Sequence, residues 1–193
     1  ILGLPGETKT SHLDSLNQLM ISEIENITPY TLMLLNGSEM ATNKERKKWG
    51  FKTKYRVLPR DFTKLSNGKK IVEIEEVVIE TKTLPYEDYI YCRKIALLMA
   101  VFNTTGFKPL IKILIQNDID PIDVFYQFIT RTEEYDLIEN HQKKEVTLMC
   151  DFERDTRGEL WETKDDVISF FEDDKNFDGL TEGIYGANLI QTY

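Results

Sequence analysis

Cysteine and histidine are scarce in this chain, which holds two of each among its 193 residues. Cys92 and Cys150 lie too far apart for a metal knuckle, and a single pair is no disulfide framework. Neither His12 nor His141 has a cysteine or carboxylate at a recognised metal-ligand spacing. We therefore predict no metal ligands within the chain. The scarcity of cysteine favours a reducing, cytoplasmic location.

Long hydrophobic runs and familiar catalytic motifs are also missing. The longest apolar run, 95–102, is far shorter than the roughly 20 residues of a membrane-spanning helix, so no span is predicted. Gly-x-Ser-x-Gly is absent, and the carboxylate groups 75–76 and 172–174 are more simply solvated surface than acid–base catalysts. Apolar residues at 41% and charged residues at 30% indicate an ordinary globular protein. Because no catalytic motif is present, we predict no catalytic residue in the chain.

Charge is unevenly distributed along the chain. Residues 44–60 hold eight cations and one glutamate, so this segment carries +7 and the remainder carries −16. Trp49, Phe51 and Tyr55 lie among the cations, and such a segment could neutralise phosphates and stack on bases. The simpler interpretation is a solvated helix end and loop. The acidic remainder and the lack of a recognised motif disfavour nucleic-acid binding.

The first 41 residues have the pattern of a strand, a helix and a second strand. Residues 1–8 read as a strand entering a glycine-bearing turn, with Thr8 or Ser11 opening the helix. Apolar residues at helical spacing predict a helix of about 13 residues. The stripe consists of Leu13, Leu16, Met20 and Ile24. Residues 30–35 are apolar throughout, as in a strand covered on both faces. Short connections favour a parallel crossover, and hence a doubly wound sheet or a barrel.

The remainder reads as one strand followed by helices. Residues 71–80 alternate apolar residues with glutamates, which predicts a half-exposed strand. Helices are predicted over 86–103, 109–117, 121–130, 135–152 and 163–171. The predicted fold is therefore α/β to α+β and mainly helical. Its divisions are a first part at 1–60, a connecting segment with a strand at 61–84 and a helical accessory region at 85–193.

The opening turn matches neither a Walker loop nor Gly-x-Gly-x-x-Gly. Ile1-Leu2-Gly3-Leu4-Pro5-Gly6-Glu7-Thr8 instead resembles a signature of the radical S-adenosylmethionine superfamily, in which a barrel strand ends in Ile-x-Gly-Leu-Pro-Gly-Glu-Thr. Residues 30–41 resemble the family's next barrel strand and its Pro-Gly-Thr ending, with Asn36 replacing proline and Ser38 replacing threonine. The two matches lie one βα repeat apart, which makes the pair more specific than either alone.

This resemblance implies an iron–sulfur enzyme of the Fe–S oxidoreductase or methyltransferase type, acting on a small organic substrate. In the family the strand packs near the adenine of S-adenosylmethionine, with glycines allowing close backbone approach and the glutamate bracing the turn. The cofactor-binding residues implied here are Gly3, Leu4, Pro5, Gly6 and Glu7. The implied fold is the last βα segments of a partial (β/α) barrel, within 1–60, followed by a helical C-terminal region.

The chain departs from the family in one respect. A [4Fe–4S] cluster needs three thiolates in Cys-x-x-x-Cys-x-x-Cys, which these 193 residues lack. In the family the motif lies in the first βα loop, so we expect a C-terminal fragment that is inactive without the upstream part of the same protein.

The sequence suggests two further hypotheses, one on a second cofactor and one on an alternative function. Residues 73–78, 84–89 and 183–188 are similar to the C-terminal extension of radical enzymes with an upstream cobalamin-binding domain, so cobalamin is a further candidate cofactor of the parent. The alternative function is a helical interaction module that binds RNA or another phosphate-bearing partner through 44–60. Binding that weakens steeply with salt would support this alternative.

Overall fold

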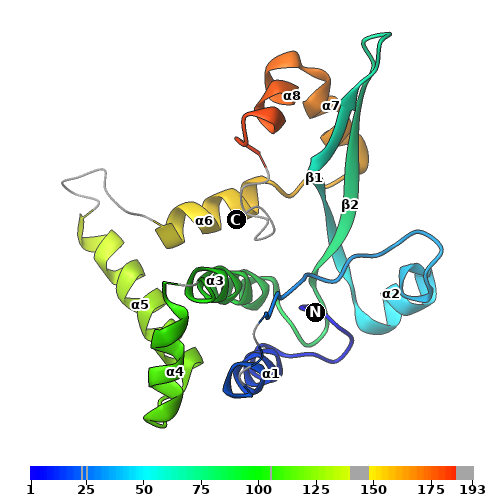
Figure 1. Cartoon of the computed structure of the whole chain (residues 1–193). Helices are drawn as coiled ribbons and strands as arrows, with labels where there is room; N and C mark the ends of the chain where they lie inside the picture. The colour runs from blue at the N-terminus through cyan, green and yellow to red at the C-terminus, as the bar shows by residue number, and fades with distance from the viewer. Residues whose placement is uncertain (23, 25, 105, 140–147, 186–193) are drawn as a thin grey trace.

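The computed structural model describes residues 1–22, 24, 26–104, 106–139 and 148–185. These residues form a mixed, mostly helical fold in which a long two-stranded hairpin rises away from a group of helices (Figure 1). The first residues of the chain lie near the base of the hairpin (Figure 1). The mainly helical mixed α/β class predicted from the sequence is confirmed.

Helix α1 (Lys9–Ile21) has the predicted length of 13 residues. Its N-cap is Thr8, one of the two expected residues. The Thr8 hydroxyl accepts the Ser11 N–H at 3.1 Å and the Ser11 hydroxyl accepts the Thr8 N–H at 2.9 Å, so two end groups of the helix are satisfied reciprocally. Leu16 and Met20 are buried, whereas Ile24 lies beyond the helix end and is exposed.

The extended segments on either side of α1 pair in parallel, as the sequence predicted. The pairing consists of one bridge between Leu2 and Thr31. The Leu2 N–H donates to the Tyr30 carbonyl at 2.7 Å, and the Leu32 N–H donates to the Leu2 carbonyl at 2.8 Å. No barrel is seen among the described residues, and the only sheet that they form is the two-stranded hairpin. The partial barrel therefore stays a prediction.

Strands β1 (Lys52–Lys64) and β2 (Lys70–Glu80) form the antiparallel hairpin. β2 contains the strand predicted at 71–80. The loop expected within 44–60 is wrong, because residues 52–60 belong to β1. The division predicted between residues 60 and 61 falls inside β1. On its other side β2 pairs antiparallel with residues 32–34 through a Met33–Val77 bridge, so the hairpin is attached to the extended segment that follows α1.

A short helical segment links the extended residues 30–35 to the hairpin. It consists of a 3₁₀ helix, η1 (Glu39–Ala41), and helix α2 (Asn43–Trp49), which Thr42 caps.

Six helices follow the hairpin in the described part of the chain, namely α3 (Tyr86–Phe102), α4 (Lys108–Gln116), α5 (Pro121–Glu139), α6 (Leu148–Gly158), α7 (Lys164–Glu172) and α8 (Asp174–Thr181). α3, α4 and α7 agree with the sequence prediction to within one residue at each end. Of the helix predicted at 135–152, residues 135–139 belong to α5 and residues 148–152 belong to α6. Residues 140–147 lie outside the described part.

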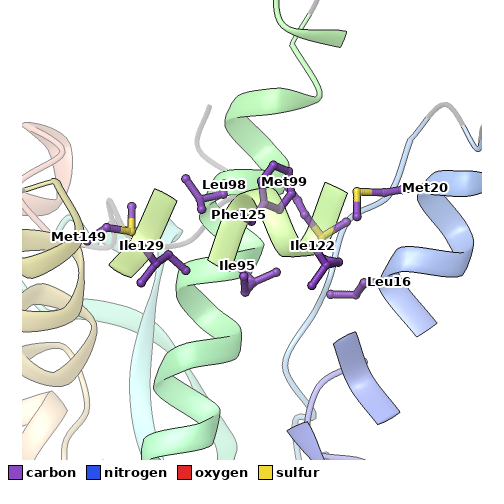
Figure 2. Close-up of a cluster of buried hydrophobic side chains, with 9 residues drawn as sticks. All are labelled: Leu16, Met20, Ile95, Leu98, Met99, Ile122, Phe125, Ile129 and Met149. Carbon is purple, nitrogen blue, oxygen red and sulfur yellow. The ribbon is translucent and has the colours of Figure 1, made fainter. Parts of the chain in front are cut away.

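The core is divided into clusters around α3 and the hairpin. The largest joins α1, α3, α5 and α6, and Figure 2 shows its side chains in a row from Met149 at one end to Leu16 and Met20 at the other. A second cluster lies beneath the opening turn and includes Leu2, Val77, Leu84, Tyr89 and Cys92. A third packs Val57 of β1 against α7 and α8. Full burial of each large apolar side chain stabilises such clusters by about 1.5–3 kcal/mol.

The start of α7 gives a direct test of local capping. The Thr163 hydroxyl accepts the Asp166 N–H at 3.1 Å, and the Asp166 carboxylate accepts the Thr163 N–H at 3.0 Å. Thr163→Ala should lower the free energy of unfolding by about 1 kcal/mol, because it removes the acceptor for an orphan helix donor. Urea unfolding followed by circular dichroism measures this change. The matched control is Thr10→Ala on the exposed side of α1, which should be neutral or slightly stabilising.

Candidate functional site

The opening turn is held in a conformation that requires glycine at two positions. Gly3 has φ +93° and Gly6 has φ +80°, values that side-chain-bearing residues rarely adopt. The Glu7 N–H donates to the Leu4 carbonyl at 3.0 Å and closes a β-turn with Pro5 and Gly6 at its centre. Proline followed by a glycine of positive φ is the residue pattern of a type II turn. The five residues that the resemblance implies as a cofactor site therefore form one compact turn.

The Glu7 carboxylate braces this turn from within. One oxygen, Oε2, accepts the Gly3 N–H at 2.6 Å and the Leu4 N–H at 3.3 Å, while Oε1 lies 2.9 Å from His12 Nδ1. Burial by itself raises the pKa of Glu7, but the hydrogen bonds from His12 and Gly3 outweigh burial, so the pKa lies below its usual value. The Thr83 hydroxyl donates to the Glu7 carbonyl at 2.6 Å and ties the turn to the end of the hairpin. This geometry fits the bracing role that the resemblance implies.

The turn residues differ in what they leave open to a ligand. Gly3 is buried, and a Cβ there would lie 3.7 Å from Leu32 Cβ and 3.6 Å from the Val78 carbonyl oxygen. Leu4 and Pro5 are half-buried. Gly6 is exposed, and no atom lies within 4 Å of the position that its Cβ would take. A ligand could therefore approach the backbone at Gly6, whereas Gly3 serves packing within the chain.

The parallel bridge fixes the edge at which this turn lies. The opening turn follows Leu2, and the turn Asn36–Ser38 follows the extended residues 30–35, of which Thr31 bridges Leu2 in parallel. Both turns therefore come at the carboxyl ends of neighbouring extended segments. Open α/β sheets bind ligands outside the carboxyl ends of their strands. The geometry thus identifies this edge as the candidate site.

His12 is a member of the site that the sequence reasoning missed. Its side chain is buried, with 2% of the residue exposed, and Nε2 has no hydrogen-bond partner among the described residues. Glu7 immediately precedes the N-cap Thr8, and His12 is the fourth helical residue. Side chains at these two positions commonly meet across a helix start, usually as an apolar pair. The spacing Glu-x-x-x-x-His around the Thr8 cap is the sequence pattern that could have predicted the contact between Glu7 and His12.

The described residues contain no group of three or more histidine, cysteine, aspartate or glutamate side chains that could hold a metal ion. Cys92 is buried in the second cluster, and burial raises the pKa of its thiol to about 12. Cys150 is exposed. His141 lies outside the described residues. A thiolate ligand set for an iron–sulfur cluster is therefore not present in the part of the chain that the structure describes.

The two cysteines should differ sharply in reactivity toward dithionitrobenzoate at pH 8. Only the thiolate reacts, and a pKa of about 12 in place of the ordinary 8.5 lowers its fraction more than about 1000-fold. We expect one fast thiol, Cys150, in the native protein and two in denaturant. Two fast thiols in the native protein would show that Cys92 is not buried as described.

The basic segment 44–60 is largely paired within the chain. Within the described part of the chain, five of its eight cations form ion pairs, which are Arg46–Glu76, Lys48–Glu45, Lys52–Glu80, Lys54–Glu162 and Arg56–Glu75. The expectation that 75–76 are solvated carboxylates is wrong, because Glu75 is buried and both residues accept hydrogen bonds from arginines. Intramolecular pairing lowers the field available to a polyanion. RNA binding through this segment stays a prediction.

None of the helices in the described ranges combines the length and the apolar character of a transmembrane span. We also compared the chain with protein-family models and with curated proteins, and neither comparison produced a match.

Proposed function

We propose that this chain is the C-terminal part of an iron–sulfur radical S-adenosylmethionine enzyme of the Fe–S oxidoreductase or methyltransferase type. The observation that carries the proposal is the turn Gly3–Glu7, in which both signature glycines have positive φ and the signature glutamate holds the backbone of Gly3 and Leu4. The parallel bridge from Leu2 to Thr31 across α1 supports it, because a barrel repeat requires that pairing.

The turn residues would take different parts in cofactor binding. Leu4 and Pro5 would offer apolar contact to a purine ring, and Gly6 would let the cofactor reach the backbone. Glu7 would act indirectly by keeping the turn in shape, since its carboxylate is occupied by Gly3, Leu4 and His12. A reduced cluster would supply the electron for reductive cleavage of the bound cofactor.

The cluster itself does not fit the described residues, because they contain no set of thiolate ligands. In this proposal another part of the same protein provides the three thiolates, and a cobalamin domain there is a further possibility that the proposal does not require. We do not put RNA binding forward as a second function, since most cations of 44–60 already have intramolecular partners.

The proposal is tested on the longer native protein. The residues that precede Ile1 there should contain Cys-x-x-x-Cys-x-x-Cys. After reconstitution with iron and sulfide, that protein should cleave S-adenosylmethionine reductively, while the 193-residue chain alone should not. Absence of the three-cysteine motif, or a loaded cluster without any cleavage, would overturn the proposal.

A further inference from the structure

A cavity of about 140 Å³ lies where the C-terminal ends of α1 and α3 meet α4 and the start of α5. Its lining is mainly apolar and includes Met20, Met99 and Phe125, which belong to the cluster in Figure 2, together with Phe102, Ile111 and Ile115. α1 separates it from the opening turn, because the 13 residues of that helix span about 20 Å. The cavity is therefore distinct from the candidate cofactor site.

The cavity exists because α4 packs loosely. No residue of this nine-residue helix is buried, and Leu110 and Ile113 are 40% and 54% exposed on its outer side. Close-packed protein interiors leave few voids larger than a water molecule. An engineered apolar cavity of about 150 Å³ stays dry and binds benzene, so this space suits an apolar group of about six carbon atoms.

The polar part of the lining has one sign of charge. It consists of Asn103, Lys108 and Lys112, without any carboxylate. The two lysines are four residues apart on α4 and so lie on the same face of the helix. Lys112 makes no ion pair among the described residues, in a chain whose net charge is −9. Apolar walls beside two ammonium groups complement a ligand with a hydrocarbon body and an anionic head.

We propose that this cavity binds a small amphiphilic carboxylate. Its hydrocarbon or aromatic end occupies the space between Met20, Ile111 and Phe125, and its carboxylate pairs with Lys108 and Lys112. A neutral amphiphile would fill the same space without the ionic contact. A cationic one would meet two like charges. This inference does not depend on the proposed function, because no residue of the opening turn takes part.

Titration calorimetry on the 193-residue chain tests the proposal with octanoate, octanol and octyltrimethylammonium as probes. Octanoate should bind saturably, octanol about tenfold more weakly, and octyltrimethylammonium not measurably. Lys112→Glu should weaken octanoate binding about tenfold and permit binding of the ammonium probe. The control for net charge is Lys69→Glu, an exposed residue at the hairpin turn, which should leave the order of the probes unchanged.

A second pair of variants tests the cavity itself. Ile111→Trp should fill it and abolish octanoate binding, whereas Ile113→Trp, on the exposed side of the same helix, should not. Circular dichroism reports whether each variant is folded, and the surface variant Lys112→Glu keeps the test decisive if Ile111→Trp unfolds. Failure of octanoate to saturate the wild type, or equal affinity for octanol and octanoate, would overturn the proposal. Unchanged octanoate binding in folded Ile111→Trp would do the same.

Discussion

Replacing Glu7 by alanine is expected to lower the free energy of unfolding by about 2–4 kcal/mol. The change leaves the Gly3 and Leu4 N–H groups without their acceptor and removes the partner of His12 Nδ1. A hydrogen bond to a charged group contributes about 1.5–3 kcal/mol, and water can replace only part of this one because the Glu7 side chain is 14% exposed. Urea unfolding at neutral pH measures the loss.

The matched control is Glu73→Ala, at an exposed position of β2 where the carboxylate makes no ion pair or hydrogen bond among the described residues. It should change stability by less than about 0.5 kcal/mol. If Glu7→Ala costs no more than Glu73→Ala, the carboxylate does not brace the turn.

The contribution of Glu7 should also depend on pH. Because the pKa of Glu7 is lowered in the folded chain, the folded state binds its proton less readily than the unfolded state does. The stability that Glu7 contributes is therefore present above the usual value of 4.5 and lost as the pH falls through the lower, folded value. The difference between wild type and Glu7→Ala should shrink steadily below pH 4.5. A difference that grows on acidification would contradict this sign.

Replacing Arg56 by methionine is expected to cost about 3–5 kcal/mol. Arg56 and Glu75 stand opposite each other in the hairpin register, and the Arg56 guanidinium donates to the Glu75 carboxylate. Their side chains are only 14% and 8% exposed. Methionine fills similar space but leaves a carboxylate buried without its hydrogen-bond donor. Arg93, which interacts electrostatically with Glu75, offsets part of that cost.

Two further variants separate pairing from packing. Arg56→Met combined with Glu75→Leu should recover most of the loss, because an apolar pair avoids burying charge. Lys52→Met breaks the solvent-facing Lys52–Glu80 pair, in which Lys52 is 68% exposed, and should cost less than about 1 kcal/mol. Chemical unfolding of the wild type, Arg56→Met, Glu75→Leu and the double variant gives the coupling energy of the pair. Equal losses for Arg56→Met and Lys52→Met would contradict the buried pair at the hairpin.

Features that depend on local sequence were predictable. The stripe containing Leu16 and Met20 and the cap at Thr8 define α1 without reference to the rest of the chain. Gly3 and Gly6 were recognisable as turn residues, and the structure adds that Gly3 packs inside while Gly6 stays open. Capping at Thr163 likewise gave the start of α7.

Features that depend on distant partners were not predictable in the same way. β1 looked like a solvated basic loop because the partners of Lys54 and Arg56 are Glu162 and Glu75, far away in the sequence. A buried, paired glutamate has the same sequence pattern as an exposed one, so the sequence alone does not indicate that Glu75 is buried. The sequence analysis did not predict α8, although its N-cap is an aspartate. The Asp173 carboxylate accepts the N–H groups of Lys175 and Asn176.

The central claim is that the turn Gly3–Glu7 contacts S-adenosylmethionine in a larger enzyme. The most direct measurement is the dissociation constant of S-adenosylmethionine for the cluster-reconstituted longer protein, in the wild type, Gly6→Val and Gly68→Val. Both glycines have φ +80° and open space around the position of a Cβ, so valine strains the backbone equally at the two sites. We expect Gly6→Val to weaken cofactor binding at least about tenfold, which corresponds to the loss of one good contact. Gly68→Val should leave cofactor binding unchanged. Equal affinities for the two variants, or no binding by the reconstituted wild type, would contradict the claim.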